Sequence, residues 1–199
     1  MMTEREKMVT GELYSPADPE LRRMFRRAKE LTRLYNETGP DDSDARQAYL
    51  RDLLGAMGED VYIEPPFRCD YGENITVGDR FYANYDCIII DVCPVTIGRR
   101  VLLGPRVCLC TATHPLDAGT RAGGLELGRP ITIGDDVWLG GQVFVNPGVT
   151  IGNGAVVGSG SVVTRDIPAG VVAAGNPCRV LRPLTEADRQ ARRRAGLED

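Results

Sequence analysis

The sequence contains one histidine among 199 residues and has no apolar run long enough to cross a lipid bilayer. A membrane-spanning helix needs about 20 consecutive, predominantly apolar residues. The N-terminal sequence MMTEREKMVTGELY carries charges where a secretory signal peptide has an apolar segment. We therefore expect a cytoplasmic protein that neither inserts into a membrane nor is exported.

The chain also lacks an overall positive charge. Its formal net charge is −4, and basic residues are interleaved with acidic ones along the chain, apart from the run of Arg192, Arg193 and Arg194. Nucleic-acid-binding domains usually present a concentrated basic surface to the phosphates. The charge pattern argues against a nucleic-acid-binding function.

The six cysteines form no recognisable metal-binding motif. The sequence has no CxxC spacing, and its single histidine cannot complete a Cys-His zinc site. Reduced thiols are small and apolar enough for the narrow interior of a repeat fold. We expect a reduced, buried set made up of Cys69, Cys87, Cys93, Cys108, Cys110 and Cys178.

Residues 1–60 have the periodicity of a helical cap. Asp18 followed by Pro19 is typical of a helix N-terminus. Apolar residues then recur on one helical face, at Leu21, Met24, Phe25, Ala28, Leu31, Leu34 and Tyr35. A second helix is predicted from Ser43 to Met57, with an inward face of Tyr49, Leu50, Leu53, Leu54 and Met57.

From Ile75 onward, aliphatic residues recur every six positions, commonly with a glycine three residues later. The units read ITVGDR, VTIGRR, VLLGPR, ITIGDD, VWLGGQ, VTIGNG and AVVGSG. Six residues suffice only for one short strand and one tight turn, and stacked units bury a column of aliphatic side chains. Residues 61–183 are therefore predicted to form a β-helix.

Two irregularities interrupt this repeat. Val107 and Ile131 are 24 positions apart, a multiple of six, so residues 111–129 are predicted to leave the β-helix as a loop without disturbing its register. Loops on a rigid scaffold often carry function. The register also slips by two residues near Asp91 and Pro94, which the sequence alone explains only as a local bulge.

Residues 184–199 are polar, and Thr185 with Asp188 resembles a capping box ahead of a short arginine-rich helix. A solvated tail and a ligand-binding role are both open for this segment.

His114 lies in the loop and is the natural candidate for an acid-base group, because imidazole titrates near neutrality. It would remove a proton from a hydroxyl group as that hydroxyl attacks a thioester. On its own, His114 is equally compatible with an ordinary loop residue.

The segments EPPFRCDYG, FYANYDCIIIDVCPV, TATHPLD, ITIGDDVWLGG, NPGVTIG, VVTRDIP and AAGNPCRVL resemble the maltose and galactoside O-acetyltransferases, within the hexapeptide acyltransferase superfamily. The resemblance extends from TEREKMVTGELY to about Leu184. It implies a left-handed parallel β-helix, acetyl-CoA as the acetyl donor, no metal, and a homotrimer with active sites between subunits.

The resemblance also assigns site residues. It makes His114 the general base and Asn84, in FYAN, an acceptor-binding amide, and it places Asp70 at an acceptor-contacting position. Glu126 and Asp18 are weaker acceptor candidates, since a loop acid and a helix N-cap explain them equally well. Turn roles are the alternatives for Asn84 and Asp70.

The acetyl-CoA groove is expected to include arginines, which pair with phosphates, and small residues that allow close approach. The resemblance places the residues of this groove at Trp138, Gly141, Ser159, Thr164, Arg165, Arg179 and Arg182.

The predicted reaction is direct acetyl transfer to a hydroxyl, without a covalent enzyme intermediate. The pair Asp91-Val92 stands where the galactoside enzymes have two acids, and DVCPV with TATHPLD follows the maltose branch. A maltose- or glucose-type sugar is the leading acceptor, with another sugar, a lipo-oligosaccharide or a small alcohol as alternatives. A zinc-dependent β-helical carbonic anhydrase would need three histidines, and a non-catalytic module would leave the TATHP loop unexplained.

Overall fold

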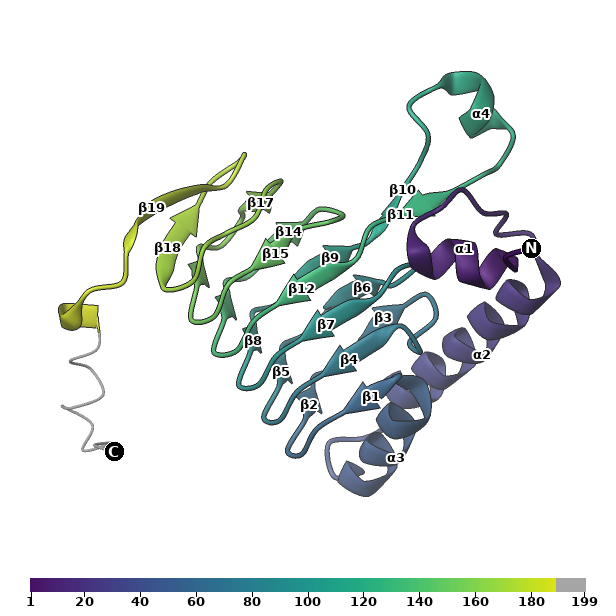
Figure 1. Cartoon of the computed structure of the whole chain (residues 1–199). Coiled ribbons are helices and arrows are strands. Elements are labelled where there is room, and N and C mark those ends of the chain that lie inside the picture. Colours follow the sequence, from purple (N-terminus) through teal and green to yellow (C-terminus); the bar gives the residue numbers. More distant parts are fainter. Residues whose placement is uncertain (189–199) are drawn as a thin grey trace.

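The computed structural model describes residues 1–188, which form a parallel β-helix closed at one end by helices (Figure 1). Three helices come first: α1 (Glu4–Thr10), α2 (Pro19–Asn36) and α3 (Ser43–Leu53). Short parallel strands then wind through three sheets in turn. The predicted fold class, a β-helix of hexapeptide repeats behind an N-terminal helical cap, is confirmed.

Each sheet collects every third strand of the β-helix. The first sheet holds β1 (Ala56–Met57), β4 (Ile75–Val77), β7 (Val95–Ile97), β12 (Ile131–Ile133) and β15 (Thr150–Ile151). The second holds β2 (Tyr62–Ile63), β5 (Tyr82–Ala83), β8 (Leu102–Leu103), β13 (Trp138–Leu139), β16 (Val156–Val157) and β18 (Val171–Ala174), followed by the antiparallel β19 (Arg179–Pro183). The third holds β3 (Arg68–Cys69), β6 (Ile88–Ile90), β9 (Cys108–Cys110), β14 (Phe144–Val145) and β17 (Val162–Val163).

The six-residue period arises because the inward-facing positions of all three sheets meet in one core. Ile75, Val95, Ile131 and Val149 are at most 3% exposed and stack inside the first sheet. A coil of three such units buries its apolar side chains only against the next coil, as in other solenoids.

We name the turns between sheets corner 1–2, corner 2–3 and corner 3–1. All of the extra residues that lengthen a coil lie at corner 3–1. The coil after the loop measures 18 residues, since Trp138 pairs with Val156, whereas Tyr82 pairs with Leu102 across 20 residues. Two short insertions, within residues 70–74 and 91–94, account for these longer coils, and the loop at 111–130 is stacked beside them. The register slip near Asp91 is therefore a two-residue insertion at this corner.

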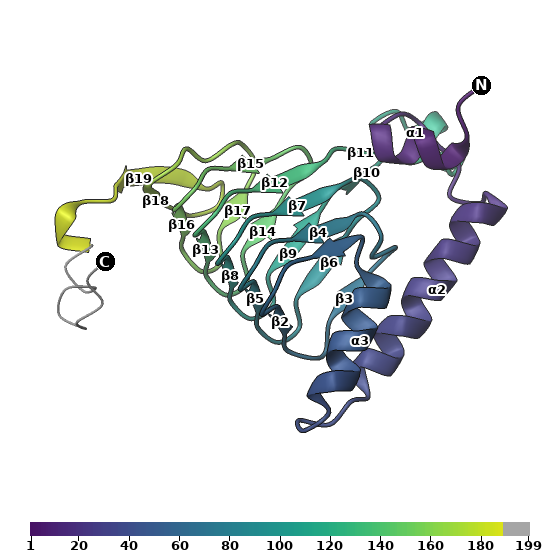
Figure 2. The same cartoon turned by 60° about the horizontal axis from the view of Figure 1, so that its bottom comes forward.

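The helices cover the first coil and extend along corner 3–1 (Figure 2). Leu21, Ala28 and Tyr35 are buried as the periodicity predicts, and the Tyr35 hydroxyl donates to the carbonyl of Ile63. Phe25 is 38% exposed, so its prediction as a core residue was wrong. Phe25 lies at the edge of a cavity, where its ring contacts Tyr71 and Lys29 and its remaining surface is open.

The second predicted helix is shorter than expected. It ends at Leu53, and Ala56–Met57 forms β1, so the β-helix starts before residue 61. The helix α1 was not predicted from the sequence, although Thr3 and Glu6 form a capping box at its start.

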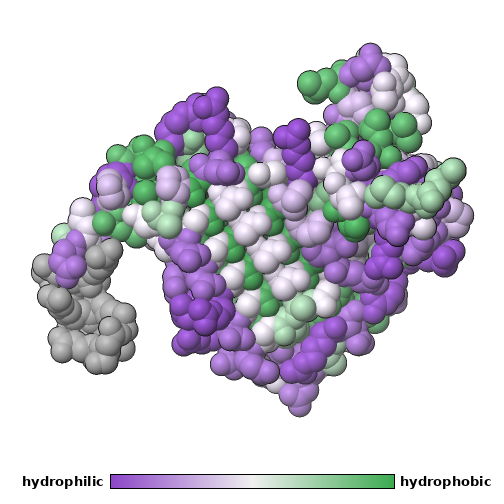
Figure 3. All heavy atoms as spheres, in the orientation of Figure 1, coloured by the Kyte–Doolittle hydropathy of each residue, from purple (hydrophilic) through white to green (hydrophobic). Residues whose placement is uncertain are grey.

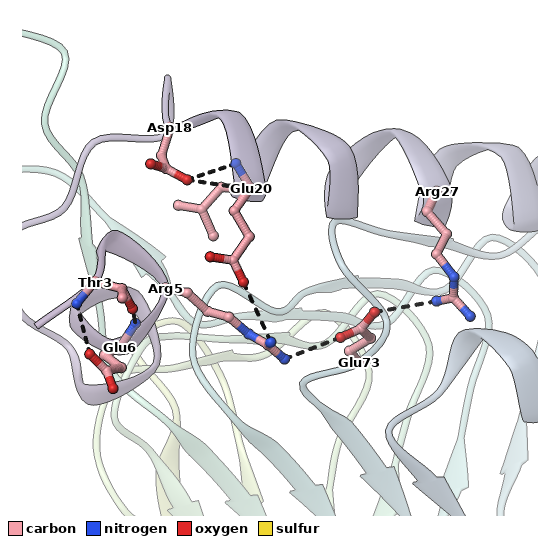
Figure 4. Close-up of polar contacts among 8 residues, drawn as sticks. Thr3, Arg5, Glu6, Asp18, Glu20, Arg27 and Glu73 are labelled. Carbon is pink, nitrogen blue, oxygen red and sulfur yellow. Dashed lines mark hydrogen bonds and ion pairs between the residues drawn. The ribbon is translucent and has the colours of Figure 1, made fainter.

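Ion pairs fix these helices to corner 3–1 (Figure 4). The carboxylate of Glu73 lies 3.3 Å from Arg5 on α1 and 3.4 Å from Arg27 on α2. Arg5 also lies 3.7 Å from Glu20. A single exposed ion pair adds little to the folding stability. A network adds more, and here one carboxylate joins two helices to the corner.

The outer faces of the three sheets differ. The first presents a ladder of threonines, Thr76, Thr96, Thr132 and Thr150, which appears pale in Figure 3. The second carries apolar side chains: Tyr62, Leu102 and Trp138 are 40%, 48% and 53% exposed. The third carries half-buried Ile88, Cys108 and Cys110 beside Phe144, which is 37% exposed.

After β19, the Thr185 hydroxyl and backbone amide both donate to Asp188, whose carboxylate also pairs with Arg182 at 2.6 Å. This pairing lowers the pKa of Asp188. The remainder of the predicted tail helix, including Arg192, Arg193 and Arg194, lies outside the described residues. Within residues 1–188, no helix is long and apolar enough to cross a membrane.

Candidate active site

The loop that carries His114 rises from corner 3–1 on a two-stranded stalk. β10 (Ala112–Thr113) pairs antiparallel with β11 (Leu127–Gly128), and the short helix α4 (Ala118–Ala122) lies at the tip (Figure 1). His114 follows β10 directly and is exposed. Thr113 pairs with Leu127, so His114 and Glu126 are the next residues beyond this last pair of the stalk.

The N-terminal segment is fastened to the base of this loop. Tyr14 and Glu126 exchange two backbone hydrogen bonds of 3.0 and 3.1 Å, and the Tyr14 hydroxyl donates to the Glu126 carboxylate at 2.6 Å. Burial first, and this hydrogen bond second, raise the pKa of Tyr14. Glu126 is therefore held in place rather than free in solvent.

A cavity of about 420 Å³ lies between α2, corner 3–1 and the loop base. Two of the predicted acceptor contacts, Asp70 and Glu126, line it together. The Asp70 carboxylate is half-buried and lies 3.2 Å from Lys29 on α2. The other lining residues are Pro16, Leu21, Arg22, Phe25, Arg26, Tyr71 and Val92.

Asp18 does not line this cavity. Its carboxylate accepts hydrogen bonds from the amides of Glu20 and Leu21 at 2.8 and 3.3 Å, as an N-cap does (Figure 4). The structure thus gives Asp18 the helix-capping role that the sequence had left as an alternative.

Beneath the cavity lies a buried carboxyl group. Asp91 is 0% exposed, and its Oδ1 accepts from the amides of Asp70 and Tyr71 at 3.0 and 2.9 Å. Its Oδ2 has no hydrogen-bond partner. Burial raises the pKa of Asp91 to about 7. Asp91 fixes the backbone that presents Asp70 and Tyr71 to the cavity.

Asn84 lies elsewhere, at corner 2–3. Its side-chain oxygen accepts from the backbone amide of Tyr85 at 2.8 Å, which is a turn-capping bond. The backbone amide of Asn84 donates to the carbonyl of Leu103. The same corner in later coils carries Gly141 and Ser159. Asn84 therefore shares an edge with two of the predicted donor-binding residues.

Neighbouring coils approach closely along this edge. A Cβ at Gly140 would lie 2.7 Å from the amide nitrogen of Ser159, so the coils approach closely where side chains are absent. None of the recorded hydrogen bonds within residues 1–188 uses the amides of Gly141 or Ser159 as donors. The amides of Gly141 and Ser159 therefore have no hydrogen-bond acceptor within residues 1–188.

The other predicted donor contacts are spread over the β-helix. Trp138 is exposed on the second sheet, and Thr164 with Arg165 is exposed at corner 3–1 after β17. Arg179 and Arg182 are on β19, where Arg182 pairs with Asp188.

The predicted residues therefore occupy different edges of one chain. His114 is at corner 3–1, while Asn84, Gly141 and Ser159 are at corner 2–3, and the third sheet lies between these corners. One chain does not bring the candidate base and the candidate donor groove together.

All six cysteines are free thiols. Four are buried, as predicted, whereas Cys108 and Cys110 are half-buried because β9 turns them to the outer face of the third sheet. Among residues 1–188, no group of three or more His, Cys, Asp or Glu side chains could hold a metal ion.

Sequence reasoning missed Tyr14, Arg22 and Phe25 as neighbours of the cavity. Helical spacing had placed Phe25 in the core, and nothing in the local sequence predicted that α2 would border the loop base. A tyrosine in a short linker carried no motif that would single it out.

Two family models match the chain. The maltose acetyltransferase hexapeptide capping motif covers residues 7–58, and the bacterial transferase hexapeptide model, with six repeats, covers residues 130–165. A putative acetyltransferase of Dictyostelium discoideum is 48% identical over 183 residues, which are 92% of this chain and 95% of that protein.

Solved structures agree with these matches. A maltose O-acetyltransferase from Clostridium difficile 630 superposes with a TM-score of 0.91 at 50% identity, covering 92% of this chain and 98% of that one. A galactoside acetyltransferase in complex with coenzyme A gives a TM-score of 0.92 at 40% identity, covering 95% and 94%. The predictions of the family and of acetyl-CoA as co-substrate are confirmed: the chain belongs to the hexapeptide-repeat acetyltransferases of the maltose and galactoside O-acetyltransferase type.

Proposed function

We propose that this acetyltransferase transfers the acetyl group of acetyl-CoA to a hydroxyl of a maltose- or glucose-type sugar, with His114 as the general base. The observation that carries the proposal is the position of the single imidazole, which is exposed on the inserted loop directly after the Thr113–Leu127 pair, while Glu126, the residue before Leu127, lines the cavity. The similarity to a maltose O-acetyltransferase supports the choice of acceptor.

The reaction proceeds in one displacement. The His114 imidazole takes the proton of the acceptor hydroxyl as its oxygen attacks the thioester carbonyl carbon. Backbone amides such as that of Gly141 stabilise the oxyanion. The C–S bond then breaks, and the coenzyme A thiolate takes the proton from the imidazolium. Asp70 and Glu126 accept hydrogen bonds from other acceptor hydroxyls.

We further propose that each site is built by two subunits of a homotrimer. Corner 3–1 of one chain would bring His114 to corner 2–3 of its neighbour, with Asn84, Gly141 and Ser159. The apolar outer faces of the second and third sheets, which meet at corner 2–3, would be covered in that assembly. Exposed apolar surface of this kind is typical of oligomer interfaces.

The test of the base is His114→Ala with Leu116→Ala, a loop residue whose side chain is 96% exposed, as the matched control. Thiol release from acetyl-CoA would be followed with a panel of sugars. We expect kcat to fall roughly 10²- to 10⁴-fold in His114→Ala, because a positioned base contributes about that factor. The control should keep its activity. Wild-type kcat in His114→Ala, with its best acceptor, would contradict the mechanism.

The donor groove is tested separately with Arg179→Ala and Arg182→Ala. Because each guanidinium would pair with a coenzyme A phosphate, we expect the KM for acetyl-CoA to rise roughly tenfold while the acceptor KM changes little. Arg182 now forms an ion pair with Asp188, and the phosphate of bound coenzyme A would take the place of that carboxylate. An unchanged acetyl-CoA KM in both variants would require another groove.

A further inference from the structure

The cavity beside the loop is bordered by two arginines whose charges no side chain balances. Arg22 and Arg26 are one helical turn apart on α2, both line the cavity, and both are exposed. Within residues 1–188, neither guanidinium takes part in any recorded ion pair or hydrogen bond. Residues four apart on a helix project from the same side.

Other basic side chains of the same helix are paired. Arg27 lies 3.4 Å from Glu73 (Figure 4), Lys29 lies 3.2 Å from Asp70, and Arg33 lies 2.7 Å from Glu37. Of the exposed arginines without partners on α2, Arg22 and Arg26 face the cavity, whereas Arg23 does not line it.

The acids of the cavity do not compensate these arginines. The Asp70 carboxylate is paired with Lys29, and the Glu126 carboxylate accepts the Tyr14 hydroxyl. The unpaired charge that the cavity presents to a ligand is therefore positive. Guanidinium groups bind carboxylates and phosphates through paired, charge-assisted hydrogen bonds.

The cavity also offers an apolar surface between its charged edges. Phe25 is 38% exposed and packs edge-on against Tyr71, with the ring centroids 6.2 Å apart. Leu21 and Val92 complete this part of the lining. The volume of about 420 Å³ suits a small molecule.

We propose that the acceptor is an acidic hydroxyl compound, whose carboxylate or phosphate pairs with Arg22 and Arg26 while its less polar surface lies on Phe25. This proposal rests on the acetyltransferase function proposed above and specifies its acceptor. Asp70 and Glu126 then bind hydroxyl groups, and the hydroxyl to be acetylated is directed toward the loop that carries His114.

The experiment compares three acceptors of one scaffold: glucose, glucuronate and glucose 6-phosphate, each with saturating acetyl-CoA. We expect kcat/KM for at least one anionic acceptor to exceed that for glucose by roughly 10- to 100-fold, the usual worth of a charge-assisted pair. The double variant R22Q/R26Q should remove this preference, because kcat/KM falls roughly 10- to 100-fold for the anionic acceptor and much less for glucose, and it should leave KM for acetyl-CoA unchanged. The preferred anion distinguishes a carboxylate from a phosphate ligand.

Arg23→Gln is the matched control and should keep the wild-type preference. Equal kcat/KM values for all three acceptors in the wild type would overturn the proposal. A rise in the acetyl-CoA KM of R22Q/R26Q would also overturn it, because the arginines would then serve the donor.

The proposed function can fail independently. If no acceptor supports thiol release, the sugar acetyltransferase assignment is contradicted, and calorimetric titration with glucuronate and glucose 6-phosphate still tests the anion site. Binding that is at least tenfold tighter in wild type than in R22Q/R26Q supports the site, and undetectable binding of both anions to wild type contradicts it.

Discussion

At the residue scale, the most unusual group is the buried carboxyl of Asp91. One oxygen holds the amides of Asp70 and Tyr71, the other has no partner, and burial raises the pKa to about 7. A buried polar group of this kind is retained where its hydrogen bonds hold the backbone in one conformation. Here that backbone is the two-residue insertion that forms one wall of the cavity.

The raised pKa predicts a pH-dependent stability. Because the folded pKa of about 7 exceeds the ordinary value of 3.8, the folded protein binds more protons than the unfolded chain between these values. The stabilisation is complete below about pH 4 and is lost as pH rises through 7. We therefore expect the unfolding free energy of wild type, relative to Asp91→Asn, to fall by up to about 4 kcal/mol between pH 4 and pH 8.

Urea unfolding of both proteins across this pH range measures that difference, and other carboxylates cancel because both proteins contain them. A difference that stays constant with pH would show that Asp91 does not titrate in this range.

Single residues were predictable where a local rule governed them. Asp18 before Pro19 predicted an N-cap, and the structure contains it. The burial of Asp91 and the exposure of Phe25 were not predictable, because both depend on how α2 lies against corner 3–1. That packing joins residues 41 and 46 positions apart, as in the Lys29–Asp70 and Arg27–Glu73 pairs, and no local pattern records it.

At the element scale, the loop behaves as an insertion of one coil length. Leu102 pairs with Trp138 across the loop, and Trp138 pairs with Val156 in the next coil. Deleting residues 112–129 would leave three residues between Leu109 and Ile131, the same number that joins Val145 to Val149. We expect the β-helix to persist and acetyl transfer to be lost, as followed by circular dichroism and thiol release.

The deletion should also lower stability by about 1–3 kcal/mol, because the Tyr14–Glu126 hydrogen bonds disappear. Tyr14→Phe is the matched comparison, since it removes the side-chain bond and retains the loop. Loss of the β-sheet signal in the deletion variant would mean that the loop is needed for folding.

The elements themselves were largely predictable from periodicity. The six-residue repeat predicted the strands and the register across the loop, because each inward side chain must be apolar. The cause of the two-residue slip was not predictable, since an insertion at a corner leaves the pattern on both sides intact. The seven-residue α1 was missed, although its capping box is present in the sequence.

At the scale of the whole molecule, the separation of His114 from Asn84 has a direct consequence for the assembly. If each site takes its base from one subunit and Asn84 from the next, His114→Ala and Asn84→Ala homotrimers both lack complete sites. Mixed trimers regain some, and random assembly gives about a quarter of sites with both native residues. Co-expression should therefore restore about a quarter of the wild-type kcat.

The control is to mix the two purified variants without subunit exchange, which should stay inactive. A second control co-expresses His114→Ala with Leu116→Ala, where sites containing His114 retain every proposed contact. If co-expressed His114→Ala and Asn84→Ala show no more activity than the variants alone, both residues act within one chain. The distance between corners 3–1 and 2–3 would then have to close by a movement of the loop.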